Sequence, residues 1–170
     1  MILVDKDIKK LGSTLIVDFY SEDNIGAVSY DLTADIYFKS SEKDSNKQYV
    51  LKPNEFIIVK TKEKLKMPND LLGIIAEKNS LIRLGLMVSG PRYQPGHETY
   101  IYLRVLNISD KNIVLKENLN IAHIFFETLA DIPNKTYNQQ NRASFNDEVN
   151  YKGFGKYDKE YKEMMDNKNL

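Results

Sequence analysis

The chain of 170 residues has no cysteine, no excess of charge of either sign and no long apolar run. Without cysteine, disulfides, thiolate metal ligands and a cysteine nucleophile are excluded, and we expect a reducing, cytoplasmic setting. Lys+Arg and Asp+Glu both count 24, so bulk charge does not direct the protein to nucleic acid. No run approaches the ~18 apolar residues of a membrane span and no signal-peptide core is present, so we expect no membrane association.

What the chain does contain is a series of short segments rich in β-branched and aromatic residues, which predicts a mostly β fold. These segments are Thr14–Tyr20, Ser29–Phe38, Glu55–Thr61, Leu71–Glu77, Thr99–Asn107, Asn112–Glu117 and Ile121–Leu129. In one of them Ile101, Leu103 and Val105 alternate with polar or aromatic residues, so one face of that strand is apolar. Many short strands separated by turn-forming residues favour a sandwich or a barrel.

Two short helices are also predicted, over Lys6–Leu11 and Asn79–Leu86. In the second, Asn79 or Ser80 is a candidate N-cap because its side chain can accept a backbone N–H. Gly85 is the expected end of that helix, since glycine adopts the left-handed conformation that often terminates helices.

The composition changes near residue 130, which divides the chain into a β domain at 1–130 and a lid or tail at 131–170. For the last ten residues an unstructured tail is one reading, because they are polar with few aliphatic side chains. The part from Lys135 to Tyr157 differs, because tyrosine and phenylalanine recur among Gly, Asn and Gln. We expect this part to order over a ligand or a neighbouring subunit.

Seven pieces in the same order resemble the dCTP deaminase/dUTPase family, deaminase branch. They are Met1–Ile8, Ala27–Asp35, Leu51–Leu86, Tyr93–Asn107, Leu115–Leu129, Lys135–Phe145 and Tyr151–Gly155. The resemblance implies a distorted β-barrel or jelly roll that forms a homotrimer with nucleotide sites between subunits. It implies no intrinsic cofactor, although Mg²⁺ accompanies a bound triphosphate.

The chain departs from this family at the two positions that carry its catalytic carboxylates. Family deaminases place a glutamate on the strand after a Pro-Gly bend, and alignment through Pro95–Gly96 puts Arg104 there. The aspartate of the dUTPase branch corresponds to Gln94. A guanidinium does not accept a proton at neutral pH, and an amide is a poor base. We therefore assign no catalytic residue.

The resemblance nevertheless implies a nucleotide or phosphate site, without metal ligands from the protein. Its predicted residues are Lys78, Asn79, Ser80, Arg83, Tyr93, Gln94, Arg104, His123, Lys135 and Gln139. The Ser80 hydroxyl can donate a hydrogen bond to a phosphate oxygen, and the Arg83 guanidinium can donate to two phosphate oxygens at once.

Structural readings compete with these roles. Arg83 fits an ion pair at a subunit interface, and Arg104 fits an ion pair on a solvated face. His123 fits a packed polar residue in a strand, and Asp31 fits a structural hydrogen-bond acceptor.

His97 and Glu98 form a tempting acid–base pair, but their spacing places them at the tip of a hairpin.

Three classes of function stay open. The first is a nucleotide-binding protein that senses or sequesters its ligand without catalysis. The second is an active, diverged dCTP deaminase or dUTPase with Glu98 or His123 as a replacement base. The third is an interaction protein that binds a protein partner and has a closed pocket.

Overall fold

The computed structural model describes residues 1–39 and 45–166 of the chain, and strands predominate in these ranges. The strands are β1 (Ile16–Asp18), β2 (Tyr30–Phe38), β3 (Ser45–Asn46), β4 (Gln48–Leu51), β5 (Phe56–Lys66), β6 (Leu71–Glu77), β7 (Leu86–Ser89), β8 (Arg92–Tyr93), β9 (Glu98–Asn107), β10 (Ile113–Lys116) and β11 (Asn120–Thr128). The predicted mostly β fold is confirmed.

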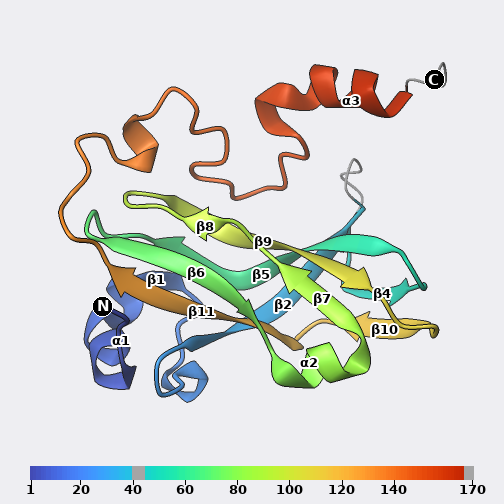
Figure 1. Ribbon diagram of the computed structural model, residues 1–170, viewed down its shortest axis with the longest axis horizontal. Helices are drawn as coiled ribbons and strands as arrows, with labels where there is room; N and C mark the ends of the chain where they lie inside the picture. Colours follow the sequence, from blue (N-terminus) through green and yellow to red (C-terminus); the bar gives the residue numbers. More distant parts are fainter. Residues whose placement is uncertain (40–44, 167–170) are drawn as a thin grey trace.

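Most of the strands form one curled antiparallel sheet, in the order β7-β9-β5-β2-β11-β6-β8 (Figure 1). β1 pairs with β5, β3 pairs with β2, and β10 and β4 form a separate two-stranded sheet. Neighbours in the large sheet are far apart in sequence, as β9 and β5 illustrate. The fold is therefore held by long-range pairing, as in other barrels and sandwiches.

The predicted alternation on β9 sets the inside and outside of the sheet. Ile101, Leu103 and Val105 are buried in the core. Tyr102 is half-buried and Arg104 is exposed on the opposite face. Because side chains alternate along a strand, the outer face of β9 is the one available to a ligand.

Helices contribute little to the core. The α-helices are α1 (Asp5–Leu11), α2 (Asn79–Leu84) and α3 (Asp158–Asp166), and short 3₁₀ turns lie at Gly12–Thr14, Glu22–Asn24, Tyr137–Gln139 and Gly155–Tyr157. None of the helices within the described ranges is long and apolar enough to cross a membrane.

The end of α2 is as predicted but its start is not. Gly85 terminates the helix at φ +84°. The expectation that Asn79 or Ser80 caps the helix is wrong, since Lys78 holds the N-cap position without a side-chain cap bond. The extended backbone of Lys78 instead directs its ammonium to Asp31.

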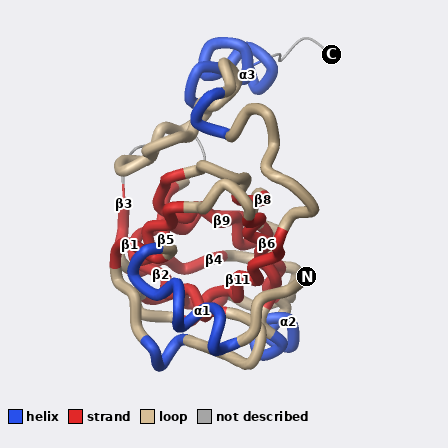
Figure 2. Tube along the Cα trace, turned by 90° about the vertical axis from the view of Figure 1, so that its left-hand side faces the viewer, coloured by secondary structure: helices blue, strands red, loops and turns tan. Residues whose placement is uncertain are grey.

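An unstructured tail is also the wrong expectation for most of the last ten residues, because α3 extends to Asp166. Residues 167–170 lie outside the described ranges. Figures 1 and 2 both show α3 on the side of β8 and β9, at the opposite end of the molecule from α1 and α2.

The C-terminal segment (residues 131–166) is attached to the bend before β9. The Tyr137 N–H donates to the Pro95 carbonyl at 2.8 Å, and the Asp147 N–H donates to the Glu98 carbonyl at 2.6 Å. Gly96 has φ +72°, and a Cβ there would lie 2.8 Å from the Thr136 Cβ. Glycine is therefore required at this bend, both for its backbone conformation and for the close approach of the segment.

Candidate functional site

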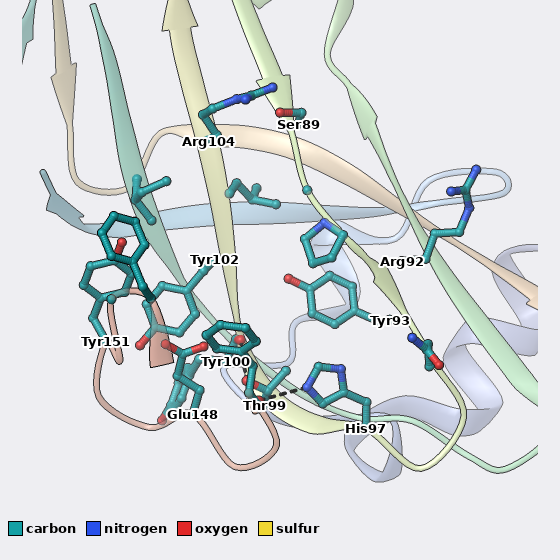
Figure 3. A pocket seen from close by; sticks show the side chains of 18 of the residues that line it. Ser89, Arg92, Tyr93, His97, Thr99, Tyr100, Tyr102, Arg104, Glu148 and Tyr151 are labelled. Atoms are coloured by element: carbon teal, nitrogen blue, oxygen red, sulfur yellow. Dashed lines mark hydrogen bonds between the residues drawn. The ribbon is translucent and has the colours of Figure 1, made fainter. Parts of the chain in front are cut away.

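A large cavity lies on the outer face of β9, under the C-terminal segment, and has a volume of about 890 Å³. We call it the β9 pocket. Its walls come from β9, from the loop before and around β8, and from the C-terminal segment. Its main polar and aromatic members are Ser89, Arg92, Tyr93, Gln94, His97, Thr99, Tyr100, Tyr102, Arg104, Tyr137, Phe145, Glu148, Tyr151 and Phe154 (Figure 3).

Arg104 lies at one end of the β9 pocket, next to Ser89 on the neighbouring strand. Its side chain is exposed, and among the described residues it forms no ion pair and no hydrogen bond. The alternative of a surface ion pair for Arg104 is therefore not observed within these ranges. An unpaired guanidinium at the edge of a cavity is suited to an anionic group of a ligand.

Aromatic side chains make up much of the β9 pocket wall. The rings of Tyr102 and Tyr151 are 5.5 Å apart between centroids, and Phe38 packs on Tyr151 at 4.7 Å. Burial raises the pKa of the Tyr151 hydroxyl to about 12 and raises the pKa of Tyr102 as well. Both phenols are consequently neutral near pH 7, and their rings form an aromatic wall of the pocket.

Glu148 brings a buried carboxyl group to the β9 pocket from the C-terminal segment; only 4% of its surface is exposed. One of its oxygens, Oε1, accepts the Lys152 N–H at 2.7 Å. Burial raises the pKa of this carboxyl above its ordinary value, opposed by the Lys152 N–H and the Lys152 charge. Sequence reasoning noticed the aromatic residues of this segment but missed its acid.

His97 lies at the bend before β9, as expected, but it is buried and lines the β9 pocket. Its ring packs 4.0 Å from the Tyr137 ring and 5.7 Å from the Tyr93 ring. Nε2 is 3.0 Å from the Phe145 carbonyl, which makes Nε2 the protonated nitrogen of a neutral imidazole. Nδ1 is buried without a hydrogen-bond partner among the described residues. Burial lowers the pKa of His97, because the C-terminal segment covers the bend.

A second group of predicted residues gathers elsewhere, around Asp31 on β2. Asp31 Oδ2 accepts the Lys78 ammonium at 2.6 Å, and Oδ1 lies 2.7 Å from His123 Nδ1. Asn120 donates to Oδ2 at 3.3 Å. We call Asp31, Lys78, Asn120 and His123 the ion cluster. In the ion cluster Asp31 acts as a structural hydrogen-bond acceptor, and His123 is a half-buried polar residue in a strand. These are the structural roles that were considered as alternatives to ligand binding.

The α2 residues next to the ion cluster are exposed. Arg83 Nε donates to Asn79 Oδ1 at 3.3 Å, which holds the guanidinium along the helix. Ser80 lies in the first turn of the same helix. None of these three residues lines the β9 pocket.

The remaining predicted residues lie on or near the β9 pocket. Tyr93 is buried in its wall, and Gln94 lines it from the loop. Gln94 and Lys135 also line a neighbouring cavity of about 370 Å³. Gln139 instead accepts the Thr136 N–H at 3.1 Å and forms a turn. Within one chain, the predicted site residues therefore lie in two separate places. One is the β9 pocket, and the other is the ion cluster together with α2.

The two proposed replacement bases are both engaged outside the β9 pocket. Glu98 pairs with the Lys64 ammonium at 2.7 Å, and His123 belongs to the ion cluster. Neither residue lines the cavity, whereas Glu148 does. Among the described residues there is also no group of three or more His, Asp or Glu side chains that could hold a metal ion.

Comparison with known proteins gives the same family as the sequence motifs. Residues 2–129 match the family model for dCTP deaminase-like proteins. The chain is 33% identical over 112 residues to a dCTP deaminase of Marinomonas sp., covering 65% of this chain and 58% of that protein. It is 27% identical over 148 residues to a dCTP deaminase of Pyrococcus horikoshii, covering 85% and 93% respectively.

Solved structures agree at the level of the fold. The 2′-deoxycytidine 5′-triphosphate deaminase of Agrobacterium tumefaciens superposes with a TM-score of 0.63 and 18% identity, over 75% of this chain and 47% of that one. A native EIAV dUTPase superposes with a TM-score of 0.50 and 20% identity, over 63% and 80%. The family match spans the β domain from Ile2 to Leu129, and the chain therefore belongs to the dCTP deaminase-like family.

Proposed function

We propose that this protein binds a nucleotide in the β9 pocket and does not carry out the deamination or diphosphate hydrolysis of its relatives. The observation that carries the proposal is Arg104, a guanidinium at the edge of the pocket that no described residue pairs with. Resemblance to the family leads us to expect a glutamate at this position. A general base there contributes about 10²–10⁴ in rate, and a guanidinium cannot take its place.

The chemistry of the β9 pocket supports a nucleotide as the ligand. Tyr102 and Tyr151 provide aromatic faces for a base, and Arg104 provides a cation for an anionic group. The relatives named dCTP deaminase are consistent with a nucleotide ligand for this family. A bound triphosphate carries Mg²⁺ with it, so binding is measured with and without that ion.

A homotrimer is the assembly that we propose for the complete site. In one chain, Ser80 and Arg83 lie on α2, outside the β9 pocket. A neighbouring subunit that places its α2 near this pocket adds a hydroxyl and a guanidinium for phosphate oxygens. Light scattering coupled to size-exclusion chromatography tests this part, and a monomer at micromolar concentration contradicts it.

The role that follows is that of a nucleotide sensor or a sequestering protein. Isothermal titration against dCTP, dUTP, dTTP, dATP, cyclic nucleotides and ADP-ribose-type nucleotides tests it, together with chromatography of each mixture after incubation. We expect at least one of these nucleotides to bind and to be recovered unchanged. Absence of binding to every nucleotide in the panel contradicts the proposal.

A second candidate, an active and diverged deaminase or dUTPase, is favoured by one observation. Glu148 is a buried carboxyl in the β9 pocket and a possible replacement base. Conversion of dCTP or dUTP by wild-type protein, and its loss in Glu148→Gln but not in Glu98→Gln, selects this candidate. Unchanged dCTP and dUTP with Mg²⁺ present select the first.

A further inference from the structure

Glu148 has an unusual hydrogen-bonding position for a buried acid. Its Oε1 accepts the Lys152 N–H, but its Oε2 makes no hydrogen bond within the described residues. In the same ranges no Lys, Arg or His nitrogen lies within the 4.0 Å of an ion pair. A carboxylate has about four acceptor positions, so much of the capacity of Glu148 is unused.

The titratable groups that line the β9 pocket together with Glu148 come from two parts of the chain. Tyr93 and Tyr102 come from the sheet, and Tyr137 and Tyr151 come from the C-terminal segment. Lys152 is the nearest charge. A hydrogen bond to a charged acceptor contributes about 1.5–3 kcal/mol, so a ligand N–H that reaches Oε2 gains a bond that no described residue makes.

Arg104 and Glu148 lie at opposite ends of the view in Figure 3, with the rings of Tyr100 and Tyr102 between them. A nucleotide has a matching polarity, because its phosphate is anionic and the edge of its base carries N–H donors. With the base stacked on the tyrosines and the phosphate toward Arg104, the base edge faces Glu148.

We propose that Glu148 selects the base of the bound nucleotide by accepting a hydrogen bond from an exocyclic amino group. This inference rests on the proposed function and names the class of ligand, which is an amino-bearing base such as cytosine or adenine. A carboxylate accepts from the amino group of cytosine. In uracil or hypoxanthine a carbonyl oxygen replaces that amino group and meets the carboxylate lone pairs.

Matched nucleotide pairs that differ only in this group test the inference by isothermal titration. The pairs are dCTP with dUTP and dATP with dITP, each mixture being checked afterwards by chromatography. We expect the amino member of at least one pair to bind wild-type protein about tenfold or more tightly than its oxo partner.

Glu148→Gln is the variant that isolates the carboxylate, because the amide keeps the size of the side chain and an oxygen for the Lys152 N–H. We expect its preference for the amino base to fall to within about threefold or to reverse, since the amide also donates. Glu160→Gln on α3 is the matched control, because Glu160 is exposed and lies outside the pocket. It should retain the wild-type preference.

The possible failures are distinguishable. If no nucleotide binds to wild-type protein, the proposed function fails and this inference fails with it. If nucleotides bind but Glu148→Gln keeps the full preference, only the role of Glu148 is overturned. If Glu148→Gln does not fold by circular dichroism, the N,N-dimethyl derivative of the preferred amino nucleotide (N4,N4-dimethyl-dCTP or N6,N6-dimethyl-dATP) decides on wild-type protein. Binding as tight as that of the unmethylated nucleotide overturns the inference.

Discussion

The ion cluster and the β9 pocket both contain charged side chains, but they use them in opposite ways. In the ion cluster Asp31 is satisfied by Lys78, His123 and Asn120. In the β9 pocket Arg104 and Glu148 lie at different ends, and neither has an ion-pair partner among the described residues. Removing one partner of a partly buried ion pair destabilises a fold, whereas charges kept apart around a cavity remain available to a ligand.

Removing Asp31 is the most direct way to disrupt the ion cluster, in which the charges are paired. We expect Asp31→Ala to lower the free energy of unfolding by about 2 kcal/mol, because the partly buried Lys78 ammonium loses its carboxylate. The side chains of Lys78 and Asp31 are only 17% and 25% exposed. Urea denaturation measures the change, with Glu22→Ala in the exposed Lys9–Glu22 pair as the control that should change nothing measurable. An equal effect of the two variants contradicts the contrast.

Gly96→Ala tests how the wall of the β9 pocket is held. We expect a loss of about 1–2 kcal/mol from the left-handed backbone and the contact with Thr136. Gly153→Ala is the matched control, since Gly153 has φ +59° but nothing within 4 Å of the added Cβ. Hydrogen exchange should accelerate across residues 135–148 in Gly96→Ala only. Equal exchange in both variants means that the close approach at Gly96 does not matter.

Glu148, the acid of the β9 pocket, should make the stability of the protein depend on pH. Burial raises the pKa of Glu148 in the folded state. The contribution of Glu148 to the free energy of unfolding is therefore fully present below the pKa that it has in the unfolded chain, and it is lost as the pH rises through the pKa that it has in the folded protein. Glu148→Gln should therefore unfold at a higher temperature than wild type at about pH 7.5, and the difference should shrink toward about pH 4. Parallel melting curves of the two proteins across this range contradict a buried acid.

The smallest expected change concerns the unpaired cation. Arg104→Met should alter the free energy of unfolding by less than about 0.5 kcal/mol, as is usual for an exposed side chain, because Arg104 has no ion-pair partner in the part of the chain that the structure describes. Lys78→Met should cost about 1 kcal/mol, because it removes one partner of Asp31. Chemical denaturation of both variants tests the difference. A cost for Arg104→Met equal to that of Lys78→Met means that Arg104 is already paired.

Much of the fold was predictable because it follows local patterns. The alternation around Ile101 and Leu103 gave the inner face of β9, and Gly85 gave the end of α2. The strands that were missed are β3, β4, β7 and β8, each of two to four residues. Strands this short have no measurable period, and long-range partners define them instead.

The candidate site was less predictable, because it depends on how distant segments meet. The position of Arg104 on an outer face could be predicted from strand alternation. The burial of His97 and Glu148 could not, since both are covered only when the C-terminal segment docks on the Pro95–Gly96 bend. Local sequence also does not show that the Lys78 ammonium pairs with Asp31, because the two residues are distant in sequence.

The role proposed for Arg104 is to hold the anionic group of a nucleotide in the β9 pocket. Its most direct test is isothermal titration of the tightest-binding nucleotide of the panel against Arg104→Ala and against Lys116→Ala, which removes an exposed cation from β10. We expect Arg104→Ala to weaken binding about tenfold or more, while Lys116→Ala should stay within about twofold of wild type. Equal affinity of Arg104→Ala and wild type contradicts it.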